Sequence, residues 1–143
     1  MYYQPKIDVA SGGWSGLESL VRWREPDGTL VHPDAFIPLF ERNGFIAEID
    51  RFVFEQVCRD LADWMEKGRK IYPVAVNISR IHILEAHFPG ELVDICRQYS
   101  VPVDMIELEL TESAFLDNPS VILEIANEIK KEGLSCPWMI LAQ

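Results

Sequence analysis

The sequence lacks the features that mark membrane, secreted and nucleic-acid-binding proteins. No apolar run approaches the ~20 residues needed to cross a bilayer, so we expect no membrane span. The first residues show no basic segment followed by an apolar one, so we expect no secretion signal and a cytoplasmic location. Basic residues are few, with 13 Lys and Arg against 23 Asp and Glu and a net charge of −10. This charge argues against binding a nucleic-acid polymer, although metal ions could still bridge a small phosphate ligand to the acidic groups.

Cysteine and histidine are also scarce, which argues against a zinc centre or a disulfide scaffold. Cys58, Cys96 and Cys136 are far apart in the sequence, with no CxxC pair and no Cys/His cluster. We therefore expect reduced, partly buried thiols. The histidines are expected in loops or at helix starts, exposed to solvent: His32, His82 and His87.

Apolar residues are abundant enough for one core. At 143 residues and 48% hydrophobic, the chain fits a single globular domain or a large part of one. Apolar positions recur with helical spacing over 50–67 and over 117–131, and each segment is followed by a glycine that can end a helix. Shorter helices are expected after Pro33 and over 90–99.

Between these helices lie short segments with the two-residue period of β-strands. YPVAVNIS places Asn77 opposite a side made of valine and isoleucine, and MIELELTE places Glu107 and Glu109 opposite isoleucine and leucine. LESLVRW puts Glu18 and Arg22 on a common face. YYQPKID is expected to form the first strand.

The order strand, helices, strand, helix, strand, helix predicts an α/β fold in which helical crossovers join parallel strands. In a barrel of this type, polar residues near the C-terminal ends of the strands form the functional site. Asn77 and Glu109 both lie near such an end. The pattern therefore predicts a site at one mouth of a barrel.

Each polar residue also has an ordinary explanation. The glutamates of IELEL fit the solvated face of an edge strand, Asn77 fits a strand-end cap, and Glu18 with Arg22 fits a surface ion pair. Taken together, two carboxylates and one amide oxygen from neighbouring strands form a set of hard ligands, suited to Mg²⁺ or Mn²⁺ rather than zinc. Arg22 and Gln4 could then hold a phosphate and a base or sugar edge.

Five motifs, in order and at their observed separations, resemble the EAL-domain family, phosphodiesterases that hydrolyse cyclic di-GMP: YYQPKID, GLESLVRWREPDG, FIPLFERNGFI, VAVNIS and IELELTES. The resemblance runs from Tyr3 to about Leu134. It implies a modified (β/α)₈ TIM-like barrel whose first strand is antiparallel to the others. It also implies two-metal hydrolysis, in which Mg²⁺ or Mn²⁺ ions bind a phosphate oxygen and generate the attacking hydroxide, giving linear pGpG.

The resemblance assigns a role to each candidate residue. It implies metal ligation by Glu18, Asn77 and Glu109, contact with cyclic di-GMP by Gln4 and Arg22, and steadying of a loop over the site by Glu112. Glu18 and Glu112 would thus form the catalytic set present here. The alanine of the family's name-giving motif is Ser19, a nearly isosteric change on the strand face opposite Glu18.

The final residues, SCPWMILAQ, depart from the family pattern. The family continues with a DDFGTG-like motif and, on later strands, a lysine, a glutamate ligand and a glutamine, none of which occurs in this chain. Reading the codons of Trp138, Met139 and Ile140 from the third base of the Trp codon gives Asp-Asp. We therefore expect residues 1–134 to be the N-terminal part of an EAL domain, with about half the strands, and 135–143 to be a frameshifted tail.

These expectations define two functions. The first is a cyclic di-GMP phosphodiesterase by descent, present as a truncated fragment without appreciable hydrolysis of its own. Its open sheet edges and exposed apolar faces would favour self-association. The alternative is a non-catalytic module that binds cyclic di-GMP or a protein partner.

Overall fold

The computed structural model of the chain describes residues 1–79, 81–82, 87–110, 124 and 127–134. Within these residues, four strands form one sheet in the order β1-β2-β5-β6. Their bounds are Tyr2–Ile7 for β1, Trp14–Leu20 for β2, Val74–Ile78 for β5 and Ile106–Leu110 for β6. β1 is antiparallel to β2, whereas β2, β5 and β6 run parallel. The expected α/β sheet with a reversed first strand is confirmed.

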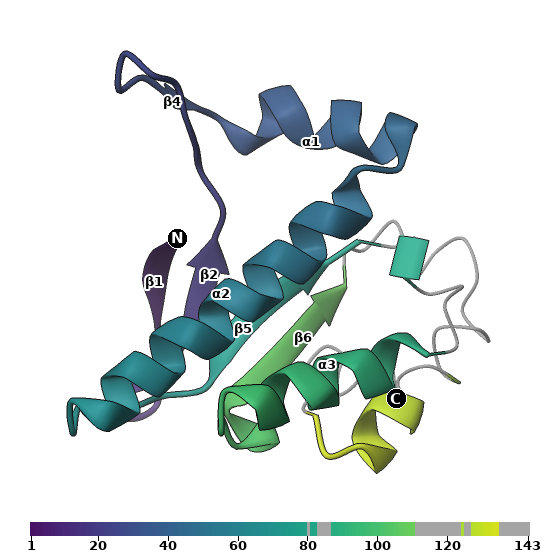
Figure 1. Cartoon of the computed structure of the whole chain (residues 1–143). Coiled ribbons are helices and arrows are strands. Elements are labelled where there is room, and N and C mark those ends of the chain that lie inside the picture. The colour runs from purple at the N-terminus through teal and green to yellow at the C-terminus, as the bar shows by residue number, and fades with distance from the viewer. Residues whose placement is uncertain (80, 83–86, 111–123, 125–126, 135–143) are drawn as a thin grey trace.

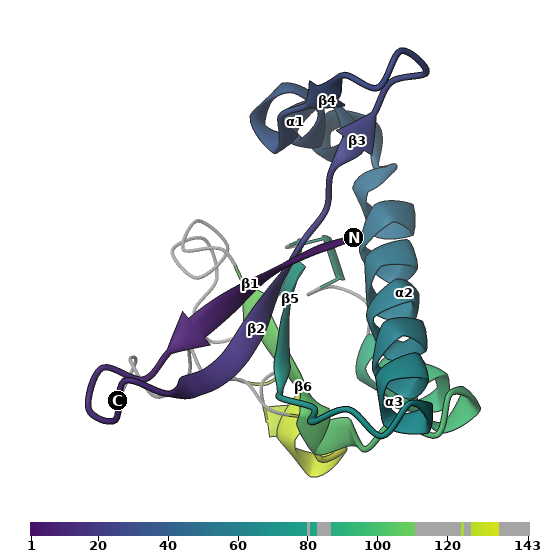
Figure 2. The same cartoon turned by 90° about the vertical axis from the view of Figure 1, so that its left-hand side faces the viewer.

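Helices cover one side of this sheet. Their bounds are Pro33–Asn43 for α1, Ile46–Glu66 for α2 and Phe88–Gln98 for α3; Val103–Met105 forms a short 3₁₀ helix, and residues 127–131 are helical. Figures 1 and 2 show α2 and α3 on the same side of the sheet, while α1 projects beyond one end. Beside α1 lies a small hairpin of β3 (Trp23–Arg24) and β4 (Leu30–Val31).

Of the two predicted long helices, one is present with a different start, and the other lies mostly outside the described residues. α2 begins at Ile46 rather than at position 50, so the buried Asp50 lies inside the helix and not at its start. The helix gives way at Gly68, whose φ of 64° is a backbone conformation that glycine adopts without strain. Of the helix predicted over 117–131, only 124 and 127–131 lie within the described residues, and these are helical.

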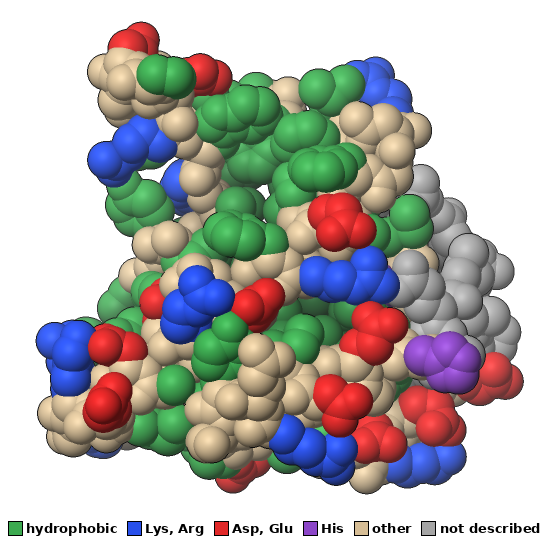
Figure 3. Space-filling view, in the orientation of Figure 1, with side chains coloured by type: hydrophobic (Ala, Val, Ile, Leu, Met, Phe, Trp, Pro, Cys, Tyr) green, Lys and Arg blue, Asp and Glu red, His purple; other side chains and the backbone are tan. Residues whose placement is uncertain are grey.

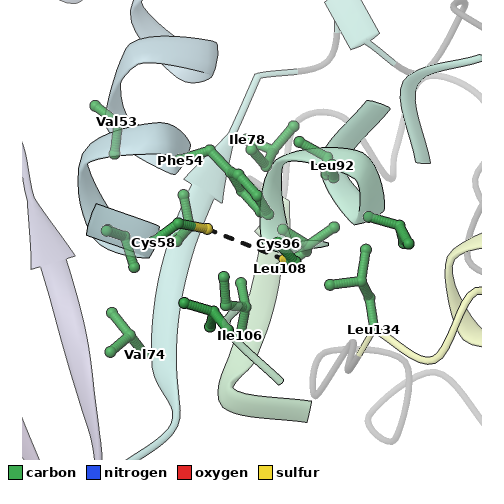
Figure 4. Packing of buried hydrophobic residues seen from close by; sticks show 14 of the residues in the cluster. Val53, Phe54, Cys58, Val74, Ile78, Leu92, Cys96, Ile106, Leu108 and Leu134 are labelled. Carbon is green, nitrogen blue, oxygen red and sulfur yellow. Dashed lines mark hydrogen bonds between the residues drawn. The ribbon is translucent and has the colours of Figure 1, made fainter. Parts of the chain in front are cut away.

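The core fills the space between the sheet and helices α2 and α3 (Figure 4). Apolar side chains on alternate positions of β5 and β6 meet the apolar stripe of α2. The members with no more than 1% exposure include Phe54, Val57, Leu61, Val74, Val76, Leu92, Ile106 and Leu108. Each such side chain stabilises the fold by about 1.5–3 kcal/mol relative to an exposed position. Because these residues face the helices, the alternating polar residues face the other way.

Cys58 on α2 and Cys96 on α3 are both fully buried in this core, with their sulfur atoms 4.0 Å apart (Figure 4). Both are free thiols, as expected. The hydrogen-bond contact with Cys96, together with burial, raises the pKa of the Cys58 thiol. These two residues therefore act as apolar packing groups. Cys136 lies outside the described residues.

An apolar patch remains on the surface around α1 and the hairpin (Figure 3). We call the following residues the α1 patch: Trp23, Leu30, Leu39, Phe45 and Phe52, with exposures between 41% and 60%. Within it, the Trp23 ring stacks on Phe40, with centroids 5.8 Å apart. Side chains of this size are usually buried, so the patch is a candidate for contact with another molecule.

Candidate functional site

Polar residues on neighbouring strands are aligned across the sheet face that points away from α2 and α3. In the strand register, Gln4 on β1 pairs with Glu18 on β2, and Asn77 on β5 pairs with Glu109 on β6. Paired residues project to the same face of a sheet. The Asn77 side-chain amide also donates a hydrogen bond to the Glu18 carboxylate, with Nδ2 and Oε1 3.3 Å apart. The structure thus places these four predicted site residues on one face.

Lys6 on β1 reaches the same face and joins two carboxylates. Its Nζ lies 2.6 Å from Oε1 of Glu109 and 3.2 Å from Oε2 of Glu107. Partial burial acts to lower the pKa of Lys6, but the hydrogen bonds and charges of Glu109 and Glu107 outweigh it and raise that pKa. The Lys6 side chain is therefore held in its protonated form between the two glutamates.

The Lys6 contacts show that the glutamates of IELEL are not a freely solvated edge, since the Glu107 and Glu109 side chains are only 22% and 29% exposed. Sequence reasoning missed Lys6, although a usable signal was present. Lys6 lies two residues after Gln4, so the strand period places both on one face.

Arg22 lies just beyond the C-terminal end of β2, where its guanidinium donates to the Val21 carbonyl over 2.8 Å. It lines a cavity of about 200 Å³ between the ends of β2 and β5 and the helices α1 and α2. The other residues of the wall are mostly apolar, and its remaining polar members are Ser19, Glu41, Asp50, Asn77 and Ser79. A cavity at the C-terminal ends of parallel strands is where α/β barrels bind their ligands.

In the wall of the cavity, the buried carboxylate of Asp50 holds the end of β5. It accepts hydrogen bonds from the backbone N–H of Ser79, at 2.8 Å, and from the Ser79 hydroxyl. The Nε2 atom of His82 lies 3.3 Å from the same carboxylate, and the His82 ring stacks on Phe88. Ser79 follows Asn77 by two residues, so this contact fixes the backbone from which Asn77 projects.

The expectation that all three histidines are exposed is wrong for His82, which is only 1% exposed. The His82 ring stacks on Phe88 and its Nε2 atom faces the Asp50 carboxylate. These contacts allow a polar side chain to occupy an interior position. His32 and His87 are exposed, as expected. Nothing in the spacing of the sequence distinguished His82 from the other two.

Glu112, the last predicted site residue, lies outside the described residues, as do residues 135–143. Within the described part of the chain, no three His, Cys, Asp or Glu side chains gather closely enough to hold a metal ion. No helix in this same part has the length and apolar character to cross a membrane.

The chain matches a known protein family, curated relatives and solved structures. The family model of the EAL domain matches residues 1–136. The chain is 34% identical over 135 residues to the cyclic di-GMP phosphodiesterase NbdA of Pseudomonas aeruginosa, covering 94% of this chain and 17% of that protein. It is 29% identical over 134 residues to MucR of the same organism, a bifunctional diguanylate cyclase and cyclic di-GMP phosphodiesterase, covering 94% of this chain and 20% of MucR.

A solved structure of the MucR phosphodiesterase in complex with cyclic di-GMP superimposes with a TM-score of 0.83 at 30% identity. The match covers 92% of this chain and 53% of the solved one. The chain therefore spans about half of a solved domain and about a fifth of the length of these curated relatives. The likeness confirms the expected TIM-barrel-like fold class, of which the described sheet is one part.

Proposed function

Because the chain belongs to the EAL domain family, we propose that it carries the N-terminal half of a metal-dependent cyclic di-GMP phosphodiesterase site. The observation that supports this most strongly is the alignment of Gln4 with Glu18 and of Asn77 with Glu109 on one sheet face. Relatives named as cyclic di-GMP phosphodiesterases share this part of the chain. We infer the substrate class from the family, and the shared sheet face supports the proposed roles of these residues.

The residues fit a divalent cation. Glu18 and Glu109 offer carboxylate oxygens and Asn77 an amide oxygen, the hard donors that Mg²⁺ and Mn²⁺ prefer. Lys6 supports the same conclusion, because an ammonium ion already lies within 2.6 Å of Glu109 and shows that this position accommodates positive charge. A bound divalent ion would supply Lewis-acid polarisation of a phosphate oxygen and lower the pKa of an attacking water.

Arg22 and Gln4 are proposed to bind and orient the dinucleotide. Arg22 and Asn77 both line the cavity, and a guanidinium group can pair with a phosphate bound near the cation. At about 200 Å³ the cavity is smaller than the roughly 300–1,000 Å³ typical of ligand pockets. We therefore assign it to part of the dinucleotide, with Gln4 contacting a base or sugar edge from the exposed end of the site.

The chain by itself is proposed to be inactive in hydrolysis. Within the described residues no three acidic side chains gather closely enough to hold a metal ion, and the single charge of Lys6 already pairs with Glu107 and Glu109. These two contacts also favour the second candidate function, in which the chain binds cyclic di-GMP without cleaving it. Both candidates place the nucleotide at Arg22, and they differ only in turnover.

Calorimetry and product analysis separate the two. Titration with cyclic di-GMP should show weak binding that strengthens with Mn²⁺ and is lost in Arg22→Ala. The matched control is Arg97→Ala, because Arg97 forms an exposed ion pair with Asp94 on α3, remote from the cavity. Chromatography should detect no pGpG. Formation of pGpG would overturn the proposed inactivity, and binding unaffected by Arg22→Ala would overturn the assigned site.

A further inference from the structure

The contact between Lys6 and Glu109 joins opposite edges of the described sheet. In the order β1-β2-β5-β6, strand β1 lies at one edge and β6 at the other. Three strand spacings of about 4.8 Å would separate them by roughly 14 Å in a flat sheet. The 2.6 Å contact therefore requires the sheet to curl toward its polar face, so that Lys6 crosses over β2 and β5 to reach Glu109.

Lys6 places its positive charge between two neighbouring carboxylates of the proposed site. Glu107 and Glu109 are two residues apart on β6, so they project from the same face and repel each other unless a cation lies between them. Lys6 contacts both, at 3.2 Å and 2.6 Å. Its side chain is 30% exposed, so the flexible four-carbon stem has a route to solvent. The ammonium group can therefore leave the glutamates without unfolding the strand.

We propose that Lys6 is a displaceable internal counter-ion that competes with a divalent cation for Glu109 and thereby sets the metal affinity of the site. This inference rests on the proposed function, because it takes Glu109 as a metal ligand. While Lys6 remains on Glu109, an arriving ion meets an occupied carboxylate oxygen and a positive charge. A unit charge and a dication about 6 Å apart in a water-like medium repel enough to change a binding constant by about tenfold.

The test is Mn²⁺ binding without nucleotide, followed by the electron paramagnetic resonance signal of free Mn²⁺ at low ionic strength. Lys6→Met keeps the length of the stem and removes the charge, and it should bind Mn²⁺ about tenfold more tightly than wild type. Lys67→Met is the matched control, because Lys67 also pairs with a carboxylate, Asp63, but at the end of α2. This control should leave the affinity unchanged.

The outcomes distinguish this inference from the proposed function. Weaker or unchanged binding by Lys6→Met, with measurable binding by wild type, would show that Lys6 does not compete and would leave the metal site standing. Absence of Mn²⁺ binding in both proteins would overturn the metal site and the role of Lys6 together. Lys6→Arg keeps the charge and should bind no more tightly than wild type.

A second measurement needs no substitution and stays informative if Lys6→Met fails to fold. Acetic anhydride labels free amines, and mass spectrometry reports the extent of labelling at each lysine. In the wild-type chain, Mn²⁺ should increase the rate of labelling at Lys6 and leave Lys67 unchanged. A rate at Lys6 that falls or stays constant on adding Mn²⁺ would overturn the displacement.

Discussion

Replacing Asp50 by alanine tests how the end of β5 is held. The substitution removes the acceptor of two hydrogen bonds from Ser79 and leaves those donors, and the nearby His82, facing an apolar methyl group. Hydrogen bonds to a charged group contribute about 1.5–3 kcal/mol each, and such contributions are not fully additive. We therefore expect Asp50→Ala to lower the free energy of unfolding by about 3 kcal/mol, a large share of the roughly 5–15 kcal/mol of a typical domain.

Urea unfolding followed by tryptophan fluorescence measures this loss. Asp50→Asn keeps one carbonyl acceptor and should cost less, about 1–2 kcal/mol. Asp94→Ala is the control, because Asp94 forms an exposed pair with Arg97, and this variant should stay within about 0.5 kcal/mol of wild type. A loss below 1 kcal/mol for Asp50→Ala would refute the reasoning.

Three further predictions concern other parts of the fold. Burial and the hydrogen bond to Asp60 raise the pKa of Tyr3 above the ordinary phenol value of about 10. The neutral phenol therefore stabilises the fold fully below about pH 10, and this contribution is lost as the pH rises above that value. Tyr3→Phe should therefore leave the tyrosinate absorbance at about pH 10 unchanged, and a decrease would contradict this. In a Cys136→Ser variant, Ellman's reagent should modify no thiol until denaturant is added, because Cys58 and Cys96 are fully buried. Rapid reaction in buffer would refute this. Phe52→Ser should weaken self-association through the α1 patch, seen as a smaller sedimentation coefficient in sedimentation velocity. A sedimentation coefficient unchanged by this substitution would show that the contact does not involve the α1 patch.

Much of the sheet could be predicted from sequence because its strands alternate clearly. The period of two in VAVNIS and IELEL fixed which side chains pack on α2 and which face away, so Asn77 and Glu109 were placed correctly on one face. The hairpin of β3 and β4 was not predicted, since two-residue strands are too short to show a period. The apolar spacing predicted a helix start at position 50, whereas α2 begins at Ile46, so its first four residues were missed.

The partners of the site residues were harder to predict than the residues themselves. The alternation shows that Glu107 and Glu109 share a face, but only the curvature of the sheet brings Lys6 to them. The burial of His82 likewise depends on Phe88 and Asp50. Contacts between positions far apart in sequence require the fold, and no local pattern encodes them.

The central claim is that Glu18, Asn77 and Glu109 form one cation site on the polar face of the sheet. Paramagnetic broadening by Mn²⁺ in an amide NMR spectrum tests it directly. At substoichiometric Mn²⁺, we predict that the strongest broadening appears together at these three residues. Broadening that spreads over exposed carboxylates such as Asp63 and Glu128, and spares the three, would contradict the claim.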